Sequence, residues 1–230
     1  MAETDKPAHL FLVVEVHTRH IEGKADSSKT LLFLNLMEAK SISDVVKKLE
    51  PYTGSDSYWE DEGKLIWTDH GKHSIHCLPY SWEDLRRLSD TTGCVLTKFP
   101  ITGDPKSYIK KPADYVFSSF YDDDPTWTTY IVSFVLITPE GDAFYQVEMI
   151  TAIDSKDIIK KTEDRVSEGF KTYQDMDGKT INAKALGIHD IDLMQTDWLG
   201  FAGRVSTWVA GATLASLDMP DGPEEYVNFV

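Results

Sequence analysis

The segment LMEAKSISDVVKKLE at positions 36–50 has a close counterpart, MITAIDSKDIIKKTE, at positions 149–163. The two segments align without a gap at an offset of 113 residues. In both, an apolar run leads into Ser or Asp, and branched apolar residues then recur at helical spacing before a Lys-Lys pair. This pattern predicts a strand that ends at a helix N-terminus, and it predicts it twice.

Two further matches follow in the same order along the chain. Residues 58–66 match 173–181 at an offset of 115, and Gly71 and His73 match Gly187 and His189 at an offset of 116. Three ordered matches with slowly drifting offsets indicate an internal duplication. Because His73 recurs as His189, we expect both side chains to make a structural hydrogen bond within the repeat.

The segments between these matches extend the prediction to a whole fold. Apolar, branched runs bounded by turn residues predict strands, and capped amphipathic runs predict helices. Strands are expected at 9–16, 30–37, 63–69, 73–80, 129–138, 142–151, 178–185 and 188–194, with a hairpin turn at 69–72, and helices at 41–52, 81–88, 154–170 and 196–217. The expected fold is therefore α+β, an internally duplicated (ββα)x4 arrangement with a curved antiparallel sheet and helices packed on one face.

Composition and repeats divide the chain into four parts. We expect a first ββαββα repeat at 8–97, a connector at 98–127, a second ββαββα repeat at 128–214 and an acidic C-terminal tail at 215–230. The connector contains prolines and several aromatic residues, so we expect it to pack on the core instead of acting as a flexible linker.

Charge is distributed unevenly over the 230 residues, whose net charge is −15. Residues 1–112 hold 15 basic against 17 acidic side chains, whereas the remainder holds 8 against 21. Six of the seven histidines also lie in the first part. If the protein binds an anion, the first half is therefore the expected place, although the overall charge disfavours nucleic acid.

The candidate site consists of residues of the first repeat that have no match in the second repeat. Two predicted hairpin tips carry cations beside a tryptophan, and they would converge if the hairpins point the same way. This combination suits a base stacked on the indole ring with phosphates on the cations. The predicted ligand-binding residues are His17, Arg19, His20, Lys24, Trp67, His70 and Lys72.

The element order over residues 9–170 resembles that of the cap-binding translation initiation factor 4E family. LLFLNLMEAKSISDVVKKL looks like the second strand and first helix of that family, and EGKLIWTDHGKHSI places Trp67 where the family has a cap-stacking Trp. The family's following Glu is replaced here by Thr68-Asp69, and the first hairpin loop has no Trp. The resemblance implies binding of RNA or nucleotides between hairpin tips, without cap specificity.

No catalytic residue is predicted, because the chain contains no nucleophile elbow, phosphate-binding loop or dinucleotide-binding glycine motif. No cofactor or metal is expected, since histidines three apart on a strand face opposite sides. We therefore expect a non-enzymatic, cytoplasmic protein that binds RNA or a nucleotide-like ligand. Two alternatives remain. One is an acidic module whose second half, including the three aspartates at 122–124, binds a basic protein. The other is a duplicated fold that binds a small molecule.

Overall fold

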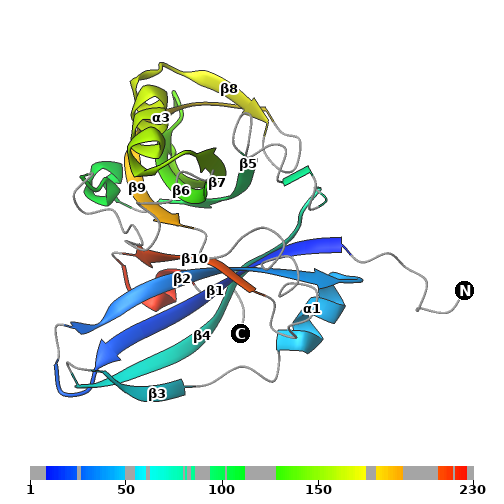
Figure 1. Cartoon of the computed structure of the whole chain (residues 1–230), viewed down its shortest axis with the longest axis vertical. Helices are drawn as coiled ribbons and strands as arrows, with labels where there is room; N and C mark the ends of the chain where they lie inside the picture. The colour runs from blue at the N-terminus through cyan, green and yellow to red at the C-terminus, as the bar shows by residue number, and fades with distance from the viewer. Residues whose placement is uncertain are drawn as a thin grey trace, which may run out of the picture. The chain divides into compact units, whose positions relative to one another are not determined.

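The structure is a computed structural model of the chain. It describes residues 9–24, 27–49, 55–60, 63–79, 81, 84–85, 94–101, 103–111, 128–174, 180–193, 212–219 and 221–226. The chain divides into two units. Unit 1 comprises Met1–Ser81 and Trp198–Val230, and unit 2 comprises Trp82–Asp197. Each unit contains one five-stranded antiparallel sheet (Figure 1).

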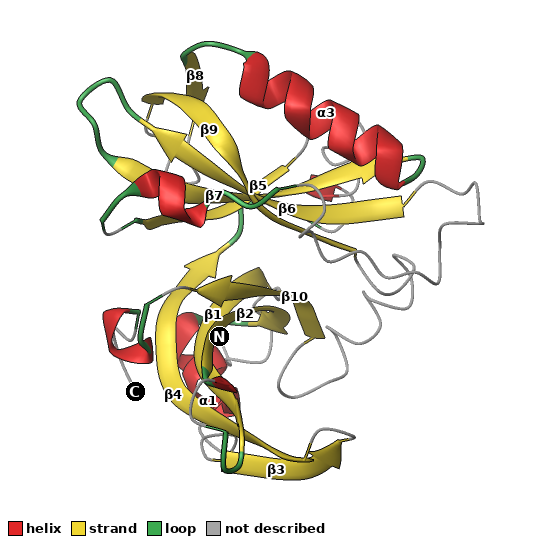
Figure 2. Cartoon of the chain, turned by 90° about the vertical axis from the view of Figure 1, so that its left-hand side faces the viewer, coloured by secondary structure: helices red, strands yellow, loops and turns green. Residues whose placement is uncertain are grey.

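The sheet of unit 1 has the strand order β10-β2-β1-β4-β3. Its elements are β1 (His9–Ile21), β2 (Lys29–Ala39), α1 (Ile42–Leu49), β3 (Ser55–Glu60), β4 (Gly63–Cys77) and β10 (Ala212–Met219). Val45 and Leu49 of α1 pack on Phe11, Val13 and Met37 of the sheet. Figure 2 shows β4 curving around the side on which α1 lies. The helix thus covers one end of the concave face.

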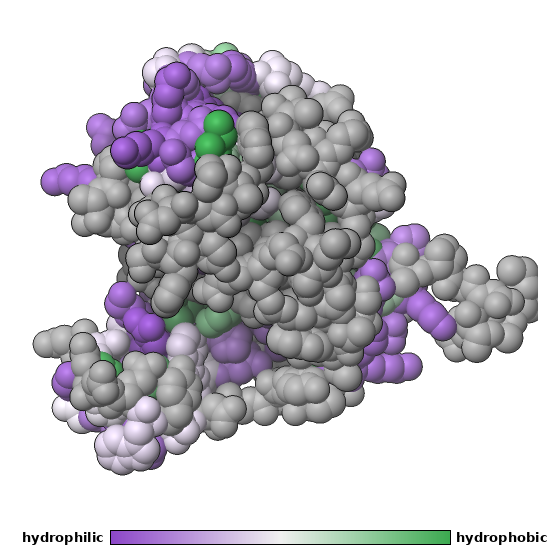
Figure 3. Space-filling model, in the orientation of Figure 1, coloured by the Kyte–Doolittle hydropathy of each residue, from purple (hydrophilic) through white to green (hydrophobic). Residues whose placement is uncertain are grey.

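The sheet of unit 2 has the order β5-β7-β6-β9-β8. Its elements are β5 (Cys94–Pro100), β6 (Thr128–Ile137), β7 (Ala143–Ala152), α3 (Ser155–Ser167), β8 (Lys171–Gln174) and β9 (Thr180–Leu193). Asp154 caps α3, since its side chain accepts a hydrogen bond from the Asp157 N–H. The apolar side of α3 packs on the sheet, and the surface over the helix is mostly hydrophilic (Figure 3).

The two sheets pair their strands in the same register, including their irregularities. Along β1, the pairing with β4 skips His73 and His70. Along β6, the pairing with β9 skips His189 and Leu186, which lie 116 residues further on. Each skipped residue is a β-bulge, which bends the strand and raises its twist. Position-by-position comparison of the two faces is therefore possible.

The outermost strands β5 and β10 are exchanged between the units. Strand β5 follows β4 in the chain, yet it pairs with β7 of unit 2; strand β10 follows β9, yet it pairs with β2 of unit 1. Both strands enter at matching positions, with Cys94 opposite Met149 and Ala212 opposite Leu36, and both shift register three residues later. Each half of the chain thus supplies one edge strand to the other unit.

An α+β architecture of mainly antiparallel strands is confirmed, but the strands form two sheets, the (ββα)x4 plan is not confirmed, and three expected elements were wrong. The hairpins expected around 69–72 and within 178–194 are the single bulged strands β4 and β9. The helix expected at 196–217 is contradicted at its end, where Ala212–Met219 form β10. Of the helix expected at 81–88, Asp84 and Leu85 are helical and most of the rest lies outside the described residues.

The expected boundaries also need correction at the two exchanged strands. Residues 94–100 form one strand of unit 2 across the predicted boundary at 97, since their backbone pairs with β7. Residues 215–230 are not simply an acidic tail, because β10 runs to Met219 and Tyr226 is buried. Residues 112–127, with the acidic run 122–124, lie outside the described residues.

Both repeated histidines make a structural hydrogen bond, as expected, but each partner lies outside the predicted repeats, in the segment 215–230 or in the connector 98–127. His73 Nδ1 lies 2.7 Å from the Tyr226 carbonyl oxygen, and His189 Nδ1 lies 2.7 Å from the Tyr108 carbonyl oxygen. Each tyrosine lies at the end of a short 3-10 helix, Pro105–Tyr108 or Pro223–Glu225. Each histidine is itself a bulged residue, of β4 or β9. Each therefore binds the short helical segment that follows an exchanged strand, β10 or β5, to the sheet of the same unit. In the described part of the chain, no helix is long and apolar enough to span a membrane.

Candidate functional site

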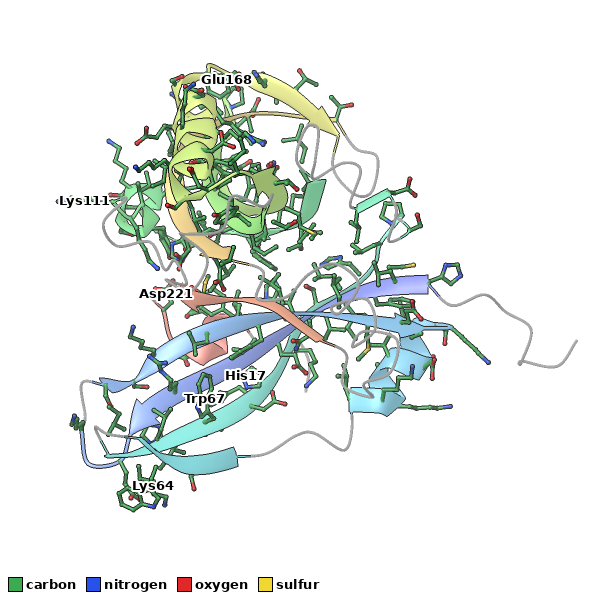
Figure 4. The ribbon with its side chains drawn as sticks, in the orientation of Figure 1. His17, Lys64, Trp67, Lys111, Glu168 and Asp221 are labelled. Atoms are coloured by element: carbon green, nitrogen blue, oxygen red, sulfur yellow. The ribbon has the colours of Figure 1, made fainter. Side chains whose placement is uncertain are left out.

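Four of the seven predicted site residues share one face of the sheet of unit 1. His17 and Arg19 lie on β1, opposite Asp69 and Trp67 of β4, and Lys72 lies opposite Glu15. Side chains two apart on a strand point to the same side, so these groups lie on the face that carries Phe11 and Val13. Figure 4 labels His17 and Trp67 on the two adjoining strands. This is the face on which α1 packs, and the four residues lie on the part of it past the end of the helix.

The other three predicted residues lie elsewhere. His20 alternates with Arg19 and so faces the opposite side of the sheet. His70 is a bulged residue whose Nε2 lies 2.8 Å from the Thr18 hydroxyl, also on that opposite side. Lys24 is exposed in the turn between β1 and β2. The expected convergence of two hairpin tips was wrong, because 69–72 lies inside a continuous strand.

A buried network of charged and polar side chains occupies the centre of this face. Asn35 Nδ2 donates a hydrogen bond of 2.6 Å to Glu15 Oε2, and Lys72 Nζ lies 3.1 Å from Glu15 Oε1. Lys72 also lies 3.2 Å from Asp69 Oδ2, and Asp69 Oδ1 accepts from the Gly71 N–H at 2.8 Å. Lys72 is only 6% exposed. We call Glu15, His17, Asn35, Asp69 and Lys72 the polar cluster.

The electrostatics of the polar cluster favour an ionised Glu15. Burial would raise the pKa of this carboxyl, but the neighbouring His17 and Lys72 side chains outweigh that effect and hold the pKa below its ordinary value. His17 Nε2 lies 3.7 Å from Glu15 Oε2, too far for a hydrogen bond. Among the described residues, this buried nitrogen has no hydrogen-bond partner. It is a polar atom that a ligand could satisfy.

Aromatic rings continue from the polar cluster towards the end of the sheet. The His17 ring meets Phe33 edge to face at 4.7 Å, and Phe33 lies 5.5 Å from Trp67 between ring centroids. The Arg19 guanidinium carbon lies 5.8 Å from the centre of the Trp67 ring. The face thus combines hydrogen-bonding groups with a partly exposed indole that carries a cation.

Four of the five positions of the polar cluster are apolar in unit 2, whereas the position of Asn35 is taken by Glu148. The shared register places Phe134, Leu136, Ala185 and Ile188 where unit 1 has Glu15, His17, Asp69 and Lys72. Ala183 likewise occupies the position that Trp67 has in unit 1, since the two residues are 116 positions apart, as are the bulged residues. All five of these apolar residues belong to the core beneath α3. At these positions unit 1 therefore has polar side chains and a tryptophan where unit 2 has a hydrophobic core.

Sequence reasoning missed Glu15, Phe33 and Asn35, because they lie within runs that predict ordinary core strands. A signal was nevertheless present. In HLFLVVEV, Glu15 lies on the same side of the predicted strand as Phe11 and Val13. In TLLFLNLM, Asn35 lies on the same side as Met37. A polar residue on the inward alternation of an apolar strand indicates a buried polar site.

Within the described residues, no group of three or more His, Cys, Asp and Glu side chains could hold a metal ion. No family model, curated protein or solved structure matches the chain. The resemblance to the cap-binding translation initiation factor 4E family therefore stays a prediction.

Proposed function

We propose that the chain is a non-catalytic binding protein that holds a small nucleotide-like ligand on the polar face of unit 1. The observation that carries this proposal is the replacement of a hydrophobic core by the polar cluster at matching positions of two sheets. Buried polar groups cost free energy when hydrophobic side chains can fill the same place. Their presence at four positions that unit 2 fills with apolar side chains is typical of a site kept for function at some cost to stability.

The side chains of the face suit the parts of a nucleotide. Trp67 offers a flat ring for a base, and the Arg19 cation beside it suits a phosphate. Glu15 and Asp69 can accept hydrogen bonds from base N–H groups or sugar hydroxyls, and His17 Nε2 offers a further polar contact. The combination supports a ligand with an aromatic ring, hydrogen-bond donors and a negative charge.

The charge balance favours a small ligand over a long RNA. Lys72 is shared between two carboxylates, so it provides little net positive potential. A groove for extended nucleic acid needs many cations along its length, whereas this chain carries a net charge of −15.

We also infer that the two units descend from one duplicated unit. The common bulges, the common entry of the exchanged strands and the matching histidine–carbonyl bonds support this inference. A common origin identifies which apolar residue of unit 2 corresponds to each member of the polar cluster except Asn35.

One variant tests both proposals. The apolar variant carries Glu15→Phe, His17→Leu, Asp69→Ala and Lys72→Ile, and so gives unit 1 the residues of unit 2. Isothermal titration calorimetry at low salt would compare it with the wild type, using nucleoside mono- and triphosphates and an oligouridylate. We expect the wild type to bind at least one nucleotide, and the apolar variant to fold but to lose binding by about 100-fold or more.

Lys64→Ala is the matched control, because Lys64 is a cation of β4 that pairs with Glu22 away from the polar cluster. This control should bind like the wild type. Nucleotide binding that persists in the apolar variant would refute the site, and the absence of any nucleotide binding by the wild type would refute the function. Binding of the oligouridylate alone would favour RNA instead. An apolar variant that fails to fold would count against the positional equivalence.

A further inference from the structure

The outer edge of β3 is an unpaired strand edge. Strand β3 lies at the end of the sheet of unit 1 and pairs with β4, from Ser55 opposite Thr68 to Glu60 opposite Gly63. No other described strand pairs with it. An edge strand presents backbone N–H and C=O groups that can form a ladder with an added strand, and proteins often cover or interrupt such edges.

A large aromatic side chain stands beside this edge. Trp59 is 78% exposed, the highest value among the exposed large hydrophobic residues described in the chain. Trp59 lies directly opposite Lys64 in the strand pair. Leu65 and Trp67 alternate with Lys64 along β4, so Trp59 points away from the α1 face that carries Trp67. An exposed tryptophan is unfavourable in water, and tryptophan is enriched in binding hot spots.

The edge strand is acidic. Its sequence, SDSYWE, holds two acidic residues and no basic one, and Asp61 and Glu62 follow directly. Because both charged residues of the strand sequence are acidic, its net charge is negative and favours a basic partner segment. A partner strand with basic side chains complements this charge, whereas an acidic strand or a nucleic acid does not.

The outer edge of β8 in unit 2 is likewise unpaired among the described strands, but it differs in charge and in its aromatic residue. Strand β8 has four residues, begins with Lys171 and contains no acidic residue. The aromatic ring next to it, Phe170, already has Lys184 Nζ at 5.3 Å from its centre. The exposed aromatic ring beside the edge of unit 2 therefore already has a cation of its own unit next to it.

We propose that β3 is a docking edge for an extended basic segment of a partner protein, which adds a sixth strand to the sheet of unit 1. The backbone ladder would provide affinity, and a lysine or arginine side chain would pack on the Trp59 ring. This site is separate from the nucleotide face and does not depend on it, since Trp59 and the polar cluster lie on opposite sides of the sheet.

The experiment uses the full chain and a fluorescein-labelled peptide, Lys-Val-Lys-Val-Lys-Val-Lys, in anisotropy titrations at two salt concentrations. Two backbone-methylated versions, each lacking alternate N–H groups, and a Glu-Val version of the same length serve as comparison probes. We expect the basic peptide to bind, one methylated version and the acidic version to fail, and Trp59→Ala to weaken binding about tenfold. Hydrogen exchange should show peptide-dependent protection at 55–60 and none at 171–174.

Phe170→Ala is the matched control, because it removes an exposed aromatic ring beside the edge strand of unit 2. It should leave binding unchanged. The proposal would be overturned if both methylated peptides bind as well as the parent peptide, because binding would then be electrostatic only. It would equally be overturned by an unchanged affinity of Trp59→Ala, by protection outside 55–60, or by an oligouridylate competing for Trp59 while the peptide does not bind.

Discussion

Unit 1 and unit 2 have sheets with the same strand order, register and bulges, yet one face is a binding surface candidate and the other is a core. In unit 2, α3 has 13 residues and covers Phe134, Leu136 and Ile188. In unit 1, α1 has 8 residues, and the polar cluster replaces those apolar side chains. The difference shows that backbone pairing and the chemistry of a sheet face are separable: a few inward positions decide between core and site.

Unit 2 retains one charged pair beneath its helix. Glu148, which is buried, contacts Arg165 of α3 and accepts a hydrogen bond from Gln146 at 2.5 Å. Arg165 also lies 4.7 Å from the centre of the Phe134 ring. Burial raises the pKa of Glu148, although Arg165 and Gln146 oppose the shift. The longer helix thus supplies the partner for the buried Glu148 carboxylate.

The largest expected effect comes from transplanting charge into unit 2. Phe134→Glu with Ile188→Lys places the pair of unit 1 beneath α3, where Glu148 stands at the position of Asn35 and Ala185 at that of Asp69. We expect a loss of more than about 4 kcal/mol in the free energy of unfolding, because two core side chains are lost and two charges are buried. Urea unfolding measures this.

The reverse exchange should be nearly neutral. The apolar variant of unit 1 should change the free energy of unfolding by less than about 2 kcal/mol, or should increase it, because replacing buried ion pairs by fitting apolar groups often does. Equal losses in both directions would contradict the view that unit 1 keeps its polar cluster for function.

A smaller difference is expected between the two repeated histidines. His189 is 3% exposed and packs edge to face on Tyr145 at 4.9 Å, whereas His73 is half-buried. We expect His189→Ala to cost about 3 kcal/mol and His73→Ala about 1 kcal/mol in unfolding free energy. His9→Ala, at an exposed position, is the control and should change little. Equal costs would show that the two bonds hold their segments equally.

The smallest effect concerns pH and has opposite signs in the two units. The native pKa of Glu15 lies below its ordinary value of 4.5, so its contribution to stability is full above pH 4.5 and is lost as the pH falls through the lowered value. Relative to Glu15→Gln, the wild type should lose on the order of 1 kcal/mol on acidification.

For Glu148, the native pKa lies above 4.5, so the protonated form is favoured in the fold. Relative to Glu148→Gln, the wild type should therefore lose stability as the pH rises from 4.5 through the raised value. Unfolding measurements between pH 3 and 8 would compare the two variants; about equal slopes of the same sign would contradict the different environments assigned to the two carboxyls.

Much of the local structure could be predicted from the chain. The strands near 9–16, 30–37, 129–138 and 142–151 and the helix after each pair follow directly from apolar alternation and capping residues. The prediction failed where short patterns have two interpretations. Asp69-His70-Gly71-Lys72 is typical of a turn, but it forms a bulged stretch of β4 in which Gly71 has φ of 121°. ATLASLDM fits a helix end or a strand, and β2 provides the partner that decides.

The candidate site was found only in part. Attention to cations and a tryptophan identified His17, Arg19, Trp67 and Lys72, which share a face, together with His20 and His70, which do not. Two bulges change which residues of β4 point to that face, so alternation alone places the residues of this strand incorrectly. The polar partners Glu15 and Asn35 were missed because they lie in segments dominated by apolar residues.

By itself, the sequence determined the repeated strand and helix plan, the uneven charge and the unrepeated letters in which a site could lie, because these properties depend on neighbouring residues. The tertiary structure alone decided that β5 and β10 exchange sheets and that bulges rotate Lys72 and Asp69 towards Glu15. It also decided that the same positions are core in unit 2. These features arise from pairing between distant segments, whose register no local pattern specifies.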